Sequence, residues 1–108
     1  MITLLRSYKS NAIYEYYDFT DSTTQQVVHS VAYNSGQINN SEESVLLCLT
    51  GTKYTVTTHC NLNYWYPNSY LYVNAMLAGD EYQTLRAIRF HNYIGLPTTF
   101  TVNVHLSV

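Results

Sequence analysis

Strict alternation of apolar and polar residues near the C-terminal end constrains the fold more than any other feature. The apolar members occupy every second position of 99–108 and are Phe100, Val102, Val104, Leu106 and Val108. A repeat of two residues is typical of a β-strand that has one face on a core. The segment 54–64 shows the same pattern, with one face made of Tyr54, Val56, Thr58, Cys60, Leu62 and Tyr64. The sequence therefore predicts two long strands, each buried on one face.

Weaker patterns predict five further strands, at 13–19, 27–33, 45–49, 70–77 and 81–90. The uninterrupted apolar run at 45–49 is typical of a strand buried on both faces. The alternation at 81–90 slips between Tyr82 and Leu85, which indicates a bulge or a face shared with a partner chain. Turn residues separate the segments, and the polar stretch 34–44 is the longest expected loop.

Composition agrees with a β fold, because Thr and Tyr are abundant while the helix-forming residues Lys, Glu and Ala are scarce. No segment has the period of a helix. Short strands joined by turns predict an all-β protein, an antiparallel two-sheet sandwich. A chain of 108 residues without linker or repeat is expected to form one domain over 1–108.

Several classes of function are disfavoured. The chain has five Lys and Arg, scattered along it, and a net charge of -2, so we expect no nucleic-acid binding, which needs a basic stripe. No apolar run approaches the roughly 18 residues of a membrane span. The apolar patch before Arg6 is too short for the core of a signal peptide.

Catalytic and metal sites are also not predicted. The acidic pairs lie in or beside turns, and no phosphate-binding loop or nucleophile elbow is present. His59 and His105 become neighbours if their strands pair, but a metal site needs three or more convergent ligands. Cys48 and Cys60 form either one bridge between adjacent strands or, as we favour, two buried inert thiols. We therefore expect no enzyme activity and no cofactor.

The second half of the chain contains a series of β motifs. Residues 49–56 read Leu-Thr-Gly-Thr-Lys-Tyr-Thr-Val, residues 77–81 contain a Gly-Asp turn, and 100–108 form a long last strand. In order and spacing this half resembles the jelly-roll domains of the tumour necrosis factor and complement globular-head superfamily. The resemblance covers about sixty residues and implies a jelly-roll homotrimer. In that superfamily such trimers are extracellular ligands, lectins, spore-surface knobs, and viral or phage spikes and fibre tips, so it implies an extracellular or virion-surface location.

The aromatic content independently favours self-association. Twelve Tyr, three Phe and one Trp are more than one core of this size can bury with every hydroxyl group satisfied. Tyr and Trp are enriched at protein interfaces, where charged residues are depleted, and charged residues are only 11% of this chain. We expect a homo-oligomer, with a trimer favoured. Arg86 and Arg89 are candidates to pair with Glu15 or Asp80, in solvent or across such an interface.

An aromatic segment at 64–70 is the candidate binding site. Its residues suited to stacking on a sugar or contacting a protein receptor are Tyr64, Trp65, Tyr66, Asn68 and Tyr70. The alternative is that Tyr64 and Tyr66 pack inward while Trp65 covers a sheet edge. Two functions follow: a structural or receptor-recognition module, such as a homotrimeric spike or fibre tip, and a small carbohydrate-binding lectin.

Overall fold

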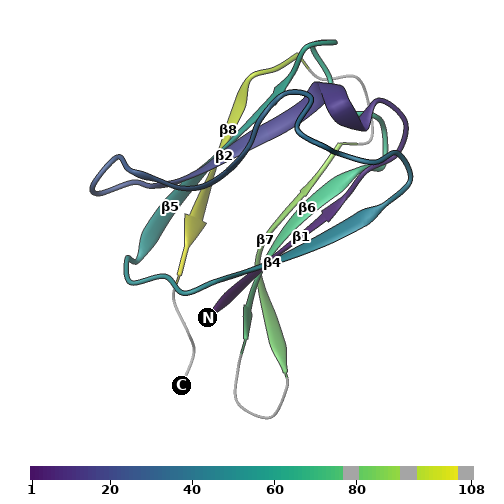
Figure 1. The fold of residues 1–108 in the computed structure, drawn as a ribbon. Helices are drawn as coiled ribbons and strands as arrows, with labels where there is room; N and C mark the ends of the chain where they lie inside the picture. The colour runs from purple at the N-terminus through teal and green to yellow at the C-terminus, as the bar shows by residue number, and fades with distance from the viewer. Residues whose placement is uncertain (77–80, 91–94, 105–108) are drawn as a thin grey trace.

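The computed structural model describes residues 1–76, 81–90 and 95–104. Within them, eight strands form two sheets that pack face to face (Figure 1), and one 3-10 turn lies outside the sheets. In chain order the elements are β1 (Ile2–Ser7), η1 (Ala12–Tyr14), β2 (Glu15–Asp21), β3 (Val27–Val31), β4 (Glu42–Leu47), β5 (Lys53–Cys60), β6 (Tyr70–Met76), β7 (Tyr82–Arg89) and β8 (Thr98–Asn103).

Each sheet has four strands. Sheet I has the order β4-β1-β6-β7 and sheet II has the order β3-β2-β5-β8. Every neighbouring pair is antiparallel. The predicted all-β antiparallel sandwich is thus confirmed, whereas jelly-roll connectivity remains a prediction.

The strands with regular alternation have the predicted inward faces. In β8, Val102 is fully buried between exposed neighbours, and in β5 the buried residues are Tyr54, Val56 and Thr58. Their inward positions meet directly, since Val56 pairs with Phe100 and Tyr54 with Val102. The strand β5 ends at Cys60, four residues earlier than predicted, and 105–108 lie outside the described residues.

The irregularity predicted within 81–90 is a β-bulge. Val73 of β6 pairs with Arg86 of β7, but the next residue, Asn74, pairs with Thr84. Leu85 is the extra residue. It shifts the alternation of β7 by one position, so that Ile88 points inward and is buried while Ala87 points outward. A bulge of this kind twists the strand locally.

Two sequence-based predictions about strands were wrong or incomplete. The strand β1 was not predicted, although it lies in the centre of sheet I between β4 and β6, with Ile2 and Leu4 buried. The strand β4 was expected to be buried on both faces but is an edge strand, and its Leu46 is 59% exposed. Apolar residues occupy both faces of β4, so its sequence has the same pattern as a central strand.

The cysteines differ from the prediction of two buried thiols. Both are free, so the alternative of a bridge between them is not realised. Cys60 is half-buried at the end of β5, where burial raises the pKa of its thiol. Cys48 is exposed, because the residue after Leu47 continues the alternation of β4 toward the solvent side.

A buried ion pair joins the two sheets. The Arg6 guanidinium on β1 donates from Nη2 to Oε1 of Glu15 on β2 at 2.5 Å, and these side chains are 1% and 0% exposed. The Arg6 guanidinium carbon also lies 3.7 Å from the Trp65 ring centroid and 4.1 Å from that of Tyr8. Glu15 therefore pairs with Arg6 within one chain, not with Arg86 or Arg89 as we had considered.

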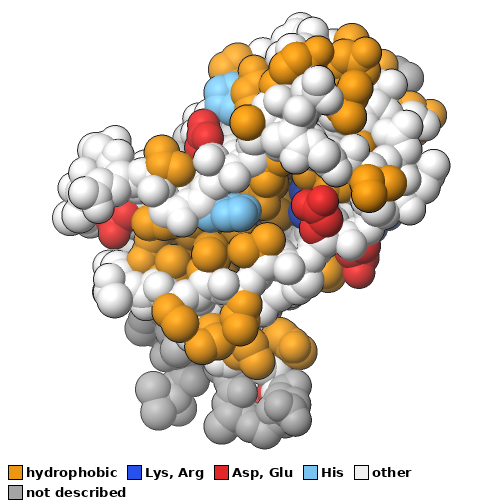
Figure 2. All heavy atoms as spheres, in the orientation of Figure 1, with side chains coloured by type: hydrophobic (Ala, Val, Ile, Leu, Met, Phe, Trp, Pro, Cys, Tyr) orange, Lys and Arg blue, Asp and Glu red, His pale blue; other side chains and the backbone are white. Residues whose placement is uncertain are grey.

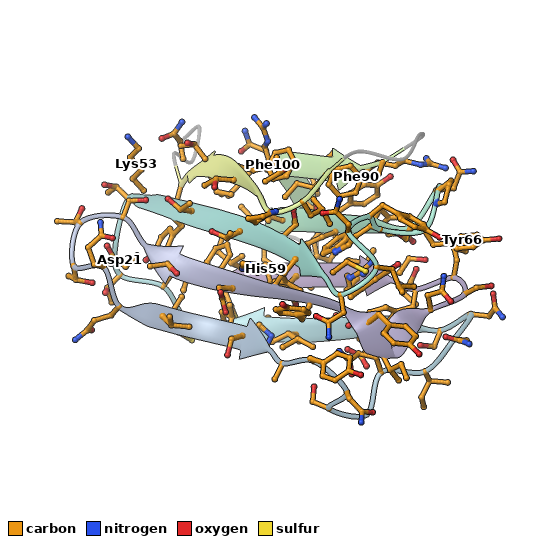
Figure 3. The ribbon with its side chains drawn as sticks, turned by 90° about the horizontal axis from the view of Figure 1, so that it is seen from above. Asp21, Lys53, His59, Tyr66, Phe90 and Phe100 are labelled. Carbon is orange, nitrogen blue, oxygen red and sulfur yellow. The ribbon has the colours of Figure 1, made fainter. Side chains whose placement is uncertain are left out.

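The two sides of the sandwich differ in closure. On one side β7 and β8 contact each other, and the Arg86 guanidinium carbon lies 5.3 Å from the centroid of the Phe100 ring. Figure 3 labels Phe100 on β8. On the other side the edge strands β3 and β4 do not pair. Figure 2 faces this open side, where hydrophobic side chains show between the sheets. The half-buried apolar residues there are Val31, Val45, Leu47 and Leu49.

Candidate functional site

The structure places the predicted stacking residue Trp65 in the core. Its side chain is 1% exposed, and its indole N–H donates to the backbone oxygen of His59 at 2.8 Å. The ring of Phe90 meets it edge-on with centroids 5.5 Å apart, and that of Tyr17 at 6.4 Å. Trp65 is thus a core residue whose ring is closed to a ligand.

The inward packing considered for Tyr64 and Tyr66 is wrong for Tyr66. Tyr66 is exposed and lies at one end of the sandwich (Figure 3), while Tyr64 is half-buried. The reason is the turn after β5, where Asn63 takes the left-handed conformation at φ 67 and ends the alternation.

The remaining predicted site residues flank a second turn. Asn68 is exposed and also left-handed, at φ 68, and its backbone N–H donates to the Phe90 oxygen at 2.7 Å. Tyr70 follows as the first residue of β6, half-buried on the outer side of sheet I. The surface therefore retains Tyr66, Asn68 and Tyr70 from the predicted site, but they flank a turn and do not form one platform.

A larger candidate surface is the outer face of sheet I. It comprises the outward residues of four strands: Glu42, Ser44 and Leu46 of β4, Thr3 and Leu5 of β1, Tyr70, Tyr72, Asn74 and Met76 of β6, and Tyr82, Thr84, Ala87 and Arg89 of β7. Leu46 and Tyr82 are 59% and 58% exposed. Charge is confined to one end, because Glu42 and Arg89 lie in the same transverse row as Tyr70.

Two tyrosines on this face are held in fixed positions. The rings of Tyr70 and Tyr72 stack with centroids 4.3 Å apart and an interplanar angle of 19°. The Tyr70 hydroxyl donates to a Glu42 carboxylate oxygen at 2.5 Å, and this hydrogen bond raises the pKa of Tyr70. The alternation within the strand predicted at 70–77 puts Tyr70 and Tyr72 on the face opposite to the apolar Leu71 and Val73, and this was the signal for the outer face.

A shallow hollow lies on the same face. It has a volume of about 310 Å³ and is lined by Thr3, Leu5, Ser44, Asn74, Tyr82 and Thr84. The Thr84 hydroxyl donates to the Asn74 amide oxygen at 2.9 Å, which fixes the orientation of that amide. An aromatic ring, an aliphatic side chain, hydroxyls and an amide are the groups that contact sugars and uncharged protein surfaces, and no charged residue lines the hollow.

The outer face of sheet II is different in character. It consists mainly of threonines in transverse rows, with Thr20, Thr55 and Thr101 in one row and Thr57 and Thr99 in the next. His59 (Figure 3) stacks on Tyr16 at 4.9 Å, and its Nε2 lies 3.4 Å from an Asp18 oxygen. Such a polar face is typical of a sheet that meets water.

The part of the chain that the structure describes offers no group of three His, Cys, Asp or Glu side chains able to hold a metal ion. His105, which we had considered beside His59, lies outside that part. The same residues include no helix that is long and apolar enough to cross a membrane.

Comparisons of the chain with family models, curated proteins and solved structures give no match.

Proposed function

We propose that the protein is a non-enzymatic structural or recognition module that acts as a homotrimer, as in a spike, fibre tip or viral structural or receptor-binding protein. The jelly-roll connectivity implied by the sequence resemblance is part of this proposal. The observation that carries it is the outer face of sheet I, where Leu46 and Tyr82 are more than half exposed and Tyr70 and Tyr72 stack on the same face.

The physical reason for the proposal is that the outer face of sheet I differs in composition from an ordinary solvent-facing sheet. One face of an antiparallel sheet in a lone sandwich meets water and is polar, as in sheet II. Contiguous exposed apolar area is typical of interaction sites, and fully buried interface centres are enriched in Tyr and depleted of charge. The outer face of sheet I has this composition over the rows beyond Glu42 and Arg89.

Solution mass tests the proposal. The chain weighs 12.4 kDa, so light scattering after size exclusion should give a particle of about 37 kDa or a multiple of it. The double variant Tyr72→Lys with Tyr82→Lys should lower this mass, because it places two cations within the contact. The matched control, Thr57→Lys with Thr101→Lys on sheet II, should not. A mass of one chain at high concentration would contradict the proposal.

A lectin is the second candidate, favoured by the hollow beside the stacked tyrosines, which combines a ring with hydroxyls and an amide. A glycan array of the folded protein tests it, and absence of binding to any sugar would remove it. If binding is found, Tyr66→Ala and Tyr82→Ala separate the aromatic turn from the hollow. The variant at the true contact loses affinity while its melting temperature stays unchanged, since both side chains are exposed.

A further inference from the structure

A second association surface is built into the free edge of β4. We infer that β4 of one copy pairs antiparallel with β4 of a second copy, with the two Leu46 residues opposite each other on a two-fold axis. This pairing joins two copies of sheet I into one eight-stranded sheet. The inference concerns a strand edge and does not require a trimer, although Ser44 and Leu46 of β4 also belong to the outer face of sheet I.

The edge of β4 is open and regular. All six of its residues pair with β1 without a bulge, from Ile2 with Leu47 to Ser7 with Glu42. No backbone group in the described ranges 1–76, 81–90 and 95–104 forms a hydrogen bond to its other side. A row of unpaired N–H and C=O groups on an edge strand is a template for another strand.

The other edges are less suited to pairing. The strand β7 contains a bulge and two arginines, and β8 contacts β7 and is preceded by Pro97. The strand β3 is also free, but it has five residues and its pairing with β2 shifts between Phe19 and Thr20. Bulges, Pro and cationic side chains are the devices that protect edges from pairing.

Both faces of β4 expose apolar side chains. Val45 and Leu47 point between the sheets and are half-buried on the open side, while Leu46 points outward and is 59% exposed. A hollow of about 390 Å³ lies at the end of the strand, and its mixed lining includes Leu47 and Leu49 together with the polar Asp21, Thr24 and Gln26. A strand added along β4 would cover the inward and outward residues together. This open side is the one that Figure 2 displays.

The sequence of β4 identifies a second copy as the occupant, because it complements itself. In an antiparallel pair, directly opposite residues point to the same face. A two-fold axis that relates two copies of β4 must therefore run between the two copies of one residue. With Leu46 on the axis, Val45 meets Leu47 twice on the inner face, and Ser44 meets Cys48 on the outer face. Apolar residues then face apolar residues from Val45 to Leu47.

Charge selects the antiparallel direction. Glu42 and Glu43 both lie at the start of β4. In the proposed register the two Glu43 residues are six positions apart, which is about 20 Å along the strands. Parallel pairing would instead set like charges side by side, which is unfavourable. The acidic pair therefore restricts which alignment of two β4 strands is stable.

Cysteine cross-linking tests the contact. In a background with Cys48→Ser and Cys60→Ser, Leu46→Cys should form a disulfide-linked dimer on mild oxidation, because opposite residues have Cα atoms about 4.5–5.5 Å apart. The matched control is Ser30→Cys, an exposed position on the free edge of β3. Cross-linking of Leu46→Cys no stronger than that of Ser30→Cys overturns the inference, as does efficient cross-linking at Val45→Cys in its place.

A charge exchange gives a second, independent readout. In the Tyr72→Lys, Tyr82→Lys background, in which association through the outer face of sheet I is removed, Leu46→Lys alone and Leu46→Glu alone should each reduce the particle to the mass of one chain, because each puts two like charges on the axis. An equimolar mixture should recover the dimer mass, and circular dichroism should show all samples folded. Failure of the mixture to recover overturns the inference. Variants at Tyr72 and Tyr82 lie on β6 and β7 and leave the Leu46→Cys cross-link intact, so the two surfaces can fail separately.

Discussion

The interior of the sandwich has two regions that are equally buried but differ in chemistry. The apolar region includes Phe19 and Tyr54, whose rings stack at 5.2 Å, and Val56 and Val73, all 1% exposed or less. The polar region contains Arg6 and Glu15, also fully buried. Apolar residues of similar shape can replace one another, whereas each charged group here requires its partner. We infer that the apolar region supplies most of the stability and that the polar region restricts which residues of the two sheets face each other.

The largest effect should come from Glu15→Gln, which keeps the shape and removes the charge. It leaves the Arg6 guanidinium buried without a counterion and weakens the acceptor for the Tyr66 N–H, now 2.7 Å from Oε2. We expect the free energy of unfolding in urea to fall by about 3–5 kcal/mol. The control Glu81→Gln, at an exposed position before β7, should change it by about 0.5 kcal/mol or less. A loss below about 1 kcal/mol for Glu15→Gln would contradict the stated difference between the regions.

Alkaline pH should also act on the polar region. Burial raises the pKa of Tyr8 to about 12. Between about pH 10 and 12 the unfolded chain has lost this proton while the folded chain keeps it, so stability decreases as pH rises. A decrease on the order of 2 kcal/mol is expected over that window, measured by urea unfolding.

Tyr8→Phe is the matched variant for the pH experiment. The Tyr8 hydroxyl is buried and has no hydrogen-bond partner among the described residues. Its removal should change stability at pH 7 by less than about 1 kcal/mol and should reduce the alkaline slope. A slope identical to that of the parent protein would mean that other groups control the alkaline transition.

A conservative change in the apolar region should have a smaller effect than Glu15→Gln. Phe19→Leu keeps an apolar side chain of similar size and loses the stacking on Tyr54. We expect a loss of about 1–1.5 kcal/mol in the same urea assay. A loss as large as that of Glu15→Gln would show that the two regions do not differ in tolerance.

The smallest net effect is expected when both charges are removed. Arg6→Met combined with Glu15→Leu leaves no uncompensated charge, so the double variant should lie within about 1 kcal/mol of the parent protein. Each single variant should be less stable than the double variant. The double-mutant cycle measures this coupling directly, and simple additivity of the two losses would refute it.

The sequence predicted the parts of the fold that depend on regular alternation. Alternation of apolar and polar residues is enough to predict β5 and β8. The slip in that alternation within 81–90 likewise indicated the bulge in β7. The strand β1 did not, because Arg6 occupies an inward position where an apolar residue is expected, and its partner Glu15 comes from the other sheet. Long-range pairing of this kind leaves no local pattern.

The candidate site was predicted less well, for a conformational reason. The aromatic segment follows β5, and its orientation depends on Asn63, whose left-handed backbone ends the strand. The two-residue alternation in the sequence gives no sign of this change in backbone direction. Trp65 is consequently buried and Tyr66 exposed. The outer face of sheet I needed knowledge of strand order, since its residues come from β4, β1, β6 and β7.

The central place of β1 in sheet I has a consequence for how the protein folds. Its neighbours in the sheet are β4 and β6, so Ile2 meets Leu47 on one side and Ala75 on the other. Sheet II, in contrast, begins with the local hairpin of β2 and β3. Contacts distant in sequence form slowly because long loops must close first. During synthesis the 62 residues 8–69 separate β1 from β6, so the apolar face of β1 would stay exposed until β6 is made.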